Sequence, residues 1–189
     1  MNLVALDPGK NNFAYAVICA GKCKQHGHVR TVTDLNYRNV RDELIRFSHD
    51  IDQVLTRHAS WLAFERMQHR PHMGGGAVVE YINLMLGVCI EKALRRDAQL
   101  YPVSSVTWKS HYVRAFNLDK QRFTMATQKL SVKQPPGSKT KTKTELVTGV
   151  LAPQPRAAEL SPHEADAVGI GCYVWRQLTG IEIVDQVLR

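Results

Sequence analysis

Two short apolar stretches that each end in an acidic residue constrain the fold more than any other feature of this sequence. They are residues 2–7 and 61–65, which end in Asp7 and Glu65. Between them, residues 38–58 place apolar side chains at helical spacing, namely Val40, Leu44, Phe47, Ile51 and Leu55. A helix between two strands normally makes a right-handed crossover into a parallel pairing. We therefore expect both carboxylates to emerge side by side at the carboxyl edge of an open α/β sheet, where such sheets place their sites.

The rest of the pattern predicts one α/β domain with a mixed sheet. Residues 13–20 and 27–35 follow the first strand through short, turn-rich connections, which favours a meander of three antiparallel strands. A further strand is expected over residues 99–103. Further helices are predicted over about residues 77–96, 106–116, 143–151 and 161–178. This order predicts a mixed five-stranded sheet flanked by helices, in a single domain over residues 1–189.

The formal net charge is +8, and most of it lies in one part of the chain. Residues 101–150 hold nine lysines and arginines against two acids, a net +7. Concentrated positive charge attracts polyanions, nucleic acid first among them, although a solvated loop that aids solubility has the same composition. The polar stretch 117–142, interrupted by Pro135, Pro136 and Gly137, predicts an exposed, flexible insertion. Its expected DNA contacts are Lys120, Arg122, Lys129, Lys133, Lys139 and Lys141.

The cysteines do not predict a disulfide framework, because four are too few and too scattered for a chain of this length. Cys89 and Cys172 lie among apolar residues, as buried cysteines do. The segment 19–28 holds the candidates for a zinc site, Cys19, Cys23, His26 and His28. Structural zinc sites usually separate their histidines by about three to five residues, and a single residue separates these two. The pattern favours a hairpin turn over residues 21–27 with exposed polar side chains.

The sequence shows no sign of a membrane or secretory segment. No apolar run approaches the length of about 20 residues that a membrane-spanning helix needs. No basic region precedes the first apolar run at Leu3, which argues against a secretory signal. We therefore expect no membrane association and no secretion, and a protein that acts in the cytoplasm.

The last predicted helix brings a third acid toward the edge of the sheet. Ser161 is expected to cap the helix, and Glu164, three residues later, completes a capping box that gives Glu164 a structural role. Asp166 follows His163 by three residues, so both side chains project from one face of the helix, whereas Glu164 points elsewhere. Glycines later in the helix would let it approach the sheet closely. Asp166 and His163 are therefore able to converge with the two acids at the strand ends.

Three carboxylates brought this close repel one another unless a cation neutralises them. Oxygen-rich ligand sets suit Mg²⁺ or Mn²⁺. Two such ions, bridged by a shared carboxylate, would activate a water and stabilise the leaving oxygen of a phosphodiester. An acidic metal site beside an intensely basic segment favours a nuclease, in which the lysines hold phosphates and the metals cut one.

Three motifs of the chain resemble those of the RuvC family of Holliday-junction resolvases, whose fold is RNase H-like. Residues 4–10, 63–67 and 163–167 look like the three acidic motifs of that family, in order and at fitting intervals. The resemblance covers essentially the whole chain apart from the basic insertion. It implies an endonuclease that resolves four-way DNA junctions or related branched DNA with Mg²⁺ or Mn²⁺, two ions per active site. The first motif alone is weak, but three in sequence are strong.

The resemblance also implies roles for particular residues. The metal-binding and catalytic positions would be Asp7, Glu65, His163 and Asp166. Lys109 and Lys143 match catalytic positions where the family uses basic residues near the scissile strand. Many family members place an aromatic wedge after the second acid, where this chain has Arg66 and Met67, which we expect to contact DNA. A core position is the alternative interpretation of Met67. This departure and the long basic insertion indicate a divergent member, for which a viral source is one interpretation.

Two further groups of residues are candidates for contact with DNA. The backbone N–H groups of Gly74, Gly75 and Gly76 would approach a phosphate at the positive end of a helix. A flexible loop is an equally good interpretation of these glycines. The three tryptophans lie within predicted elements and are interpreted as core rather than as base-stacking platforms, namely Trp61, Trp108 and Trp175.

Three other functions share parts of this pattern. Actin-like ATPases also open with a strand and an Asp-x-Gly turn, but they need a second related domain and a further such motif, which this chain lacks. A junction-binding protein that has lost its chemistry would keep the fold, though here all the acids are present. An RNase H-like nuclease on RNA–DNA hybrids or other branched DNA would share the site. Because a four-way junction has two symmetric strands to cut, one site per chain implies a two-fold homodimer.

Overall fold

The computed structural model describes residues 1–9, 11–29, 39–55, 59–66, 76–115 and 161–180. The basic insertion predicted over residues 117–142 and the helix predicted over 143–151 lie outside these residues. Within the described ranges, no helix is both long enough and apolar enough to cross a lipid bilayer.

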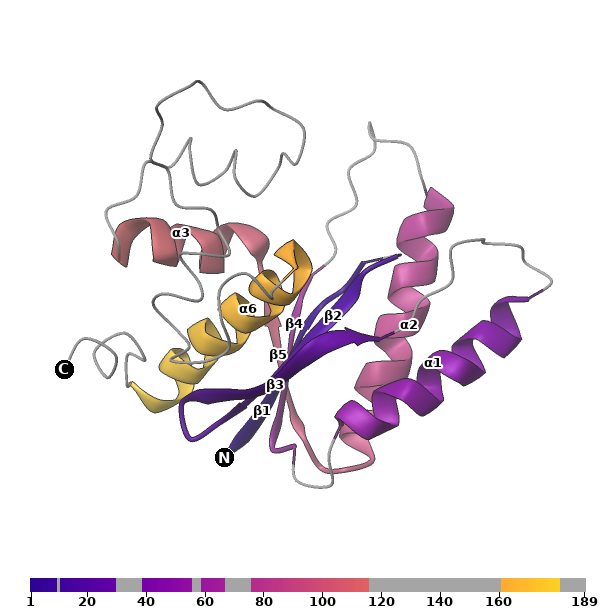
Figure 1. Ribbon diagram of the computed structural model, residues 1–189, viewed down its shortest axis with the longest axis horizontal. Helices are drawn as coiled ribbons and strands as arrows, with labels where there is room; N and C mark the ends of the chain where they lie inside the picture. The colour runs from indigo at the N-terminus through magenta and orange to yellow at the C-terminus, as the bar shows by residue number, and fades with distance from the viewer. Residues whose placement is uncertain (10, 30–38, 56–58, 67–75, 116–160, 181–189) are drawn as a thin grey trace, which may run out of the picture.

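A mixed five-stranded sheet forms the centre of the described part of the chain, in the order β3-β2-β1-β4-β5 (Figure 1). The strands are β1 (Asn2–Asp7), β2 (Phe13–Cys19), β3 (Lys22–Val29), β4 (Trp61–Glu65) and β5 (Gln99–Val103). β2 pairs antiparallel with both β1 and β3, whereas β4 pairs parallel with both β1 and β5. This topology confirms the predicted meander, the crossover from β1 to β4 and the parallel additions.

Helices cover both faces of this sheet (Figure 1). They are α1 (Val40–Val54), α2 (Gly76–Leu94), α3 (Ser105–Ala115) and α6 (Pro162–Thr179). α1 and α2 pack on one face, and α6 packs on the other. The bounds of all four helices lie within a few residues of those predicted from hydrophobic spacing and capping signals.

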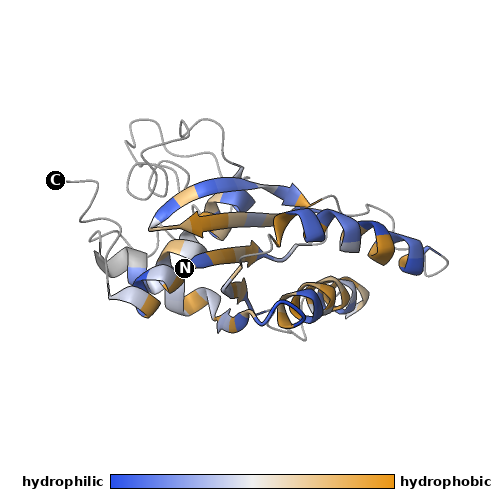
Figure 2. Ribbon diagram, turned by 90° about the horizontal axis from the view of Figure 1, so that it is seen from below, coloured by the Kyte–Doolittle hydropathy of each residue, from blue (hydrophilic) through white to orange (hydrophobic). Residues whose placement is uncertain are grey.

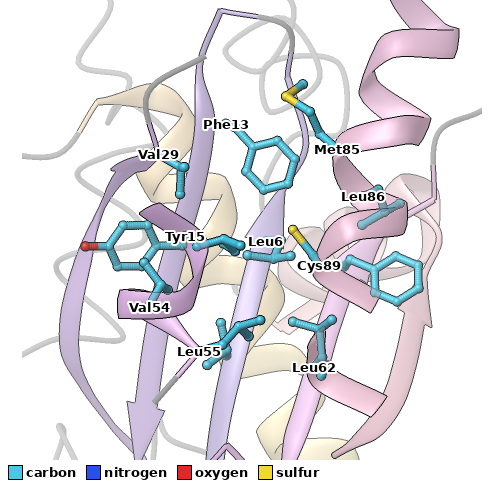
Figure 3. Packing of buried hydrophobic residues seen from close by; sticks show 14 of the residues in the cluster. Leu6, Phe13, Tyr15, Val29, Val54, Leu55, Leu62, Met85, Leu86 and Cys89 are labelled. Atoms are coloured by element: carbon cyan, nitrogen blue, oxygen red, sulfur yellow. The ribbon is translucent and has the colours of Figure 1, made fainter. Parts of the chain in front are cut away.

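Alternation along the strands divides the core into two hydrophobic layers. Leu6 belongs to the layer under α1 and α2, where it lies with Phe13 and Met85 (Figure 3). Ala5, on the opposite face of the same strand, belongs to the layer under α6. Because side chains alternate along a strand, Asp7 projects on the same side as Ala5. Asp7, at the end of β1, therefore lies on the face of the sheet that α6 covers.

The hairpin between β2 and β3 differs from the predicted one. Cys19 pairs with Lys22, so the turn consists of Ala20 and Gly21 alone, both with positive φ (49° and 75°). Such two-residue turns match the twist of a hairpin, but alanine rarely adopts positive φ and gives no turn signal. The predicted turn over residues 21–27 and the predicted start of the next strand are therefore wrong. β3 is a hydrophilic edge strand (Figure 2), and its polar side chains conceal the strand pattern.

Two glycines let α6 pack closely on its neighbours: Gly171 on the sheet, as the sequence predicted, and Gly169 on Trp108 of α3. A Cβ atom built on Gly171 would lie 2.8 Å from Ile18 Cγ1 and 3.1 Å from Ala5 Cβ. A Cβ atom built on Gly169 would lie 2.9 Å from a ring carbon of Trp108. A larger residue at position 171 would push α6 away from the strands, and one at position 169 would collide with the Trp108 ring of α3. Gly171 therefore permits the close approach of α6 to the sheet, and Gly169 permits its close packing on α3.

We expect Gly171→Ala to destabilise the fold by about 1–3 kcal/mol, the usual cost of overpacking a core. The matched control is Gly87→Ala in α2, where an added Cβ would have no neighbour within 4 Å. That control should stabilise the protein by about 0.5–1 kcal/mol, because glycine weakens a helix interior. Urea unfolding of both variants measures the difference. Stabilisation by both substitutions would contradict the close packing of α6.

Candidate active site at the carboxyl edge of the sheet

The ends of β1 and β4 place two carboxylates next to each other. The parallel register pairs Leu6 with Phe64, and Asp7 and Glu65 each follow one residue later. Ala63, like Ala5 on β1, lies in the layer under α6, so Glu65 projects to the same side of the sheet as Asp7. Asp7 is buried, at 8% exposure. The sequence-based prediction that these two acids meet at the carboxyl edge is confirmed.

The first turns of α6 lie over this edge and bring two more side chains to it. His163 Nδ1 lies 2.9 Å from Asp7 Oδ2, a contact between residues 156 positions apart in the chain. Asp166, one helical turn later, is buried at 8% exposure. The predicted convergence of His163 with Asp7 is therefore present.

α3 contributes a cation and an indole to the same place. Lys109 Nζ lies 3.9 Å from Asp166 Oδ2, and it also lies 4.9 Å from the centre of the Trp108 ring. The indole Nε1–H of Trp108 donates a hydrogen bond of 2.9 Å to Glu65 Oε2. The sequence predicted Trp108 as a core residue, and it is fully buried. Its contact with Glu65 has no signal in the sequence and was missed.

The electrostatics of Glu65 show that the three acids share one environment. Burial raises the pKa of the Glu65 carboxyl, and the nearby negative charges of Asp7 and Asp166 raise it further. The Lys109 ammonium and the Trp108 hydrogen bond oppose this shift but do not cancel it. A bound cation would stabilise the ionised form of this carboxyl group. Its positive charge would offset both the cost of burying the carboxylate and the repulsion from the other acids.

Glu164 lies on a different face of α6 and has a structural role, as predicted. Its backbone N–H donates to Ser161 Oγ at 3.2 Å, and its carboxylate accepts from the Ser161 N–H at 2.9 Å, which completes the capping box. His26 Nδ1 lies 2.9 Å from Glu164 Oε1, and His28 Nε2 lies 3.4 Å from Oε2. Burial alone would raise the pKa of Glu164, but the hydrogen bonds from His26 and Ser161 outweigh it and lower the pKa.

The histidines considered for zinc binding thus join β3 to the start of α6. Cys23 packs against the core, and burial raises the pKa of its thiol to about 11, which disfavours the thiolate that zinc binds. Within the described ranges, no three His, Cys, Asp or Glu side chains stand together in an arrangement ready to hold an ion. At the acidic edge, Asp7 is instead engaged by His163, and Asp166 lies near Lys109.

Two of the remaining predicted site residues, Arg66 and Gly76, lie within the described ranges. Arg66 follows β4 directly and is exposed, and its backbone N–H donates to the Val103 carbonyl at 2.8 Å. Gly76 begins α2, and an added Cβ there would meet no atom within 4 Å. The others lie outside the described residues, namely Met67, Gly74, Gly75, Lys120, Arg122, Lys129, Lys133, Lys139, Lys141 and Lys143.

Comparisons by sequence and by structure give different results. No protein-family model matches the sequence, and no curated protein matches it at a significant level. Solved structures do match the fold over nearly its whole length. Thermus thermophilus RuvC bound to a Holliday junction substrate is 16% identical, with a TM-score of 0.64 over 95% of this chain and 96% of that one.

Two further solved structures agree with this match. A second Thermus thermophilus RuvC structure is 16% identical, with a TM-score of 0.63 over 95% of this chain and 97% of that one. The yeast mitochondrial Holliday junction resolvase is 13% identical, with a TM-score of 0.57 over 98% of this chain and 83% of that one. The mixed sheet, the helices on both of its faces and these three matches together show that the chain has the RuvC-like, RNase H-like fold.

Proposed function

We propose that this protein is a metal-dependent endonuclease that cuts four-way (Holliday) junctions or related branched DNA. The observation that carries the proposal is the meeting of acids from β1, β4 and α6 at the carboxyl edge of a RuvC-like sheet. One structural neighbour was solved with a Holliday junction substrate, and another is a Holliday junction resolvase. The density of positive charge in residues 101–150 provides the complementary attraction for DNA.

The side chains at this edge have the ligand chemistry of a divalent-cation site, although among the described residues they do not stand in an arrangement ready to hold an ion. Asp7, Glu65 and Asp166 offer carboxylate oxygens, the ligands that Mg²⁺ and Mn²⁺ prefer, and His163 adds an imidazole at the rim. Two bound ions would supply an activated water and stabilise the leaving oxygen of a phosphodiester. Before an ion binds, His163 and Lys109 hold Asp7 and Asp166 in place through the contacts described above.

The cationic residues of the chain serve the substrate rather than the metal. We assign Lys109 to a position beside the scissile phosphate, because its ammonium lies at the acidic edge, near Asp166 and over the Trp108 ring. Lys143 is proposed for the same region, and the basic segment 117–142 for the DNA arms. Arg66 is exposed immediately after Glu65 and would contact the DNA backbone there, with Met67 next to it. Gly74, Gly75 and Gly76 are proposed to approach a phosphate.

A homodimer follows from the symmetry of the proposed substrate. A four-way junction presents two equivalent strands, and one acidic site per chain cuts one of them. Two copies related by a two-fold axis would place one site on each strand, which is also the commonest assembly of soluble oligomers. An active monomer on junction DNA, seen by sedimentation, would favour a simple flap or hybrid nuclease.

The proposal is tested by comparing a four-way junction, a three-way junction, an RNA–DNA hybrid and a linear duplex as substrates. We expect cleavage of the four-way junction in Mg²⁺, no cleavage in EDTA, and no cleavage of the linear duplex. Preferential cleavage of the hybrid would identify an RNase H-like enzyme instead. Tight junction binding without cleavage in Mg²⁺ or Mn²⁺ would identify a junction-binding protein that has lost its chemistry.

A further inference from the structure

A buried tryptophan connects three elements directly behind the acidic site. Trp108 lies in the first turns of α3 and is fully buried. Its ring lies against Gly169 of α6, where an added Cβ would be 2.9 Å from a ring carbon. Its Nε1–H donates to Glu65 Oε2, at the end of β4, over 2.9 Å. The indole therefore lies between Gly169 of α6 and Glu65 at the end of β4, with its polar atom directed at one acid of the site.

This hydrogen bond has chemical consequences for Glu65. An indole N–H is a donor only, and a buried one requires an acceptor. Because Trp108 is fully buried and packs against Gly169, its hydrogen bond restrains the orientation of the Glu65 carboxylate. Oε2 accepts from the indole, which leaves one lone pair of Oε2 and both lone pairs of Oε1 for a cation.

Lys109, the next residue of α3, lies close to a second acid of the site, Asp166. Lys109 Nζ lies 3.9 Å from Asp166 Oδ2 and 4.9 Å from the Trp108 ring centre. Consecutive residues of one helix thus contact two acids that come from different elements, β4 and α6. The packing of a single ring under Gly169 sets the position of both contacts.

We propose that Trp108 is a positioning residue that orients Glu65 for binding a divalent cation. The inference rests on the proposed function, in which Glu65 is a metal ligand. Hydrogen-bond partners behind metal ligands commonly contribute 10–100-fold, in order of magnitude, to metal affinity or activity, because they remove the freedom of the ligand to turn away. Trp108 is placed to act in this way, because its contact is with Glu65 itself.

The test is Trp108→Phe, which keeps an aromatic ring and removes the N–H, with Trp175→Phe as the matched control. Trp175 lies in the same hydrophobic layer but belongs to the later part of α6. We expect the Mg²⁺ dissociation constant, measured by calorimetry without DNA, to rise by about 10–100-fold in Trp108→Phe. The Mg²⁺ concentration for half-maximal cleavage should rise in parallel. Trp175→Phe should change neither quantity.

A spectroscopic measurement on the wild-type protein covers the case in which Trp108→Phe does not fold. The chain has three tryptophans, so Trp61→Phe and Trp175→Phe assign two indole N–H resonances and leave that of Trp108. We expect this resonance to shift on addition of Mg²⁺, and Glu65→Gln to abolish the shift. An unresponsive Trp108 resonance in a protein that does bind Mg²⁺ would overturn the proposal.

The outcomes separate this inference from the proposed function. If wild-type protein neither binds Mg²⁺ nor cuts branched DNA, the proposed function fails. If wild-type protein does both and Trp108→Phe matches Trp175→Phe in Mg²⁺ affinity, only the role of Trp108 fails. A loss of stability in Trp108→Phe with unchanged Mg²⁺ affinity would show that the indole hydrogen bond merely satisfies a buried donor.

Discussion

Replacing Asp7 or Asp166 by asparagine is expected to abolish cleavage of branched DNA while leaving junction binding intact. Asparagine keeps the size of each side chain but removes the charge that would hold a divalent cation. Metal stabilisation of a phosphodiester transition state is worth several kcal/mol, so the single-turnover rate should fall by roughly a hundredfold or more. Affinity should persist because it depends mainly on cations that meet phosphates. Single-turnover cleavage and gel-shift binding measure the two effects separately.

Glu164→Gln is the matched control for Asp166→Asn. Both residues lie in the first turns of α6 and both are 8% exposed, but Glu164 contacts Ser161 and His26 rather than the acidic edge. This control should cost on the order of 1 kcal/mol of stability at most and retain cleavage. If it proved as inactive as Asp166→Asn, the catalytic face of α6 would be wrongly assigned. Loss of junction binding in a folded Asp7→Asn variant would also contradict the site.

Replacing the basic residues of segment 117–142 by alanine is expected to weaken binding to all DNA sequences alike. The affected residues are Lys120, Arg122, Lys129, Lys133, Lys139 and Lys141. Each phosphate contact that is lost should flatten the dependence of log affinity on log salt by about 0.9. Several lost contacts together amount to orders of magnitude in affinity at low salt. Titrations of junction DNA at a series of salt concentrations measure the slope directly.

A pair of exposed lysines elsewhere provides the control for charge alone. Lys22 and Lys24 lie on the edge strand β3 and are both exposed. Replacing them removes the same charge as replacing Lys139 and Lys141, and it should leave the salt slope nearly unchanged. Lys143→Ala should lower cleavage more than binding, since Lys143 is proposed to lie near the scissile phosphate. Equal slopes for both lysine pairs would mean that the basic segment serves solubility and not DNA binding.

Local patterns in the sequence were sufficient to predict most of the fold and the core of the site. Asp7 and Glu65 each end an apolar strand, and the helix between those strands leaves a right-handed crossover as the normal connection. The Ser161–Glu164 capping box fixed the start of α6 and with it the face that carries His163 and Asp166. These features depend on neighbours within a few residues, so their pattern is visible without the tertiary structure.

The prediction failed at β3, where exposed polar side chains hide the strand pattern. β3 lies at the edge of the sheet, and its exposed polar side chains have the composition of a turn. The true turn contains Ala20, whose positive φ is imposed by the hairpin and not by its own preference. The roles of Lys143, Met67 and the basic insertion fall outside the described residues and stay predictions.

The sequence alone predicted which acids meet at the carboxyl edge of the sheet, because strand ends and helix caps are local properties of the chain. Only the tertiary structure decided what lies behind those acids. Trp108 meets Glu65 across 43 residues, and His26 meets Glu164 across 138. No periodicity encodes such contacts, because they depend on how closely α6 packs on the sheet. Gly171 lets α6 approach the sheet and Gly169 lets it pack on Trp108, and these contacts become visible only when the packed layers are seen together.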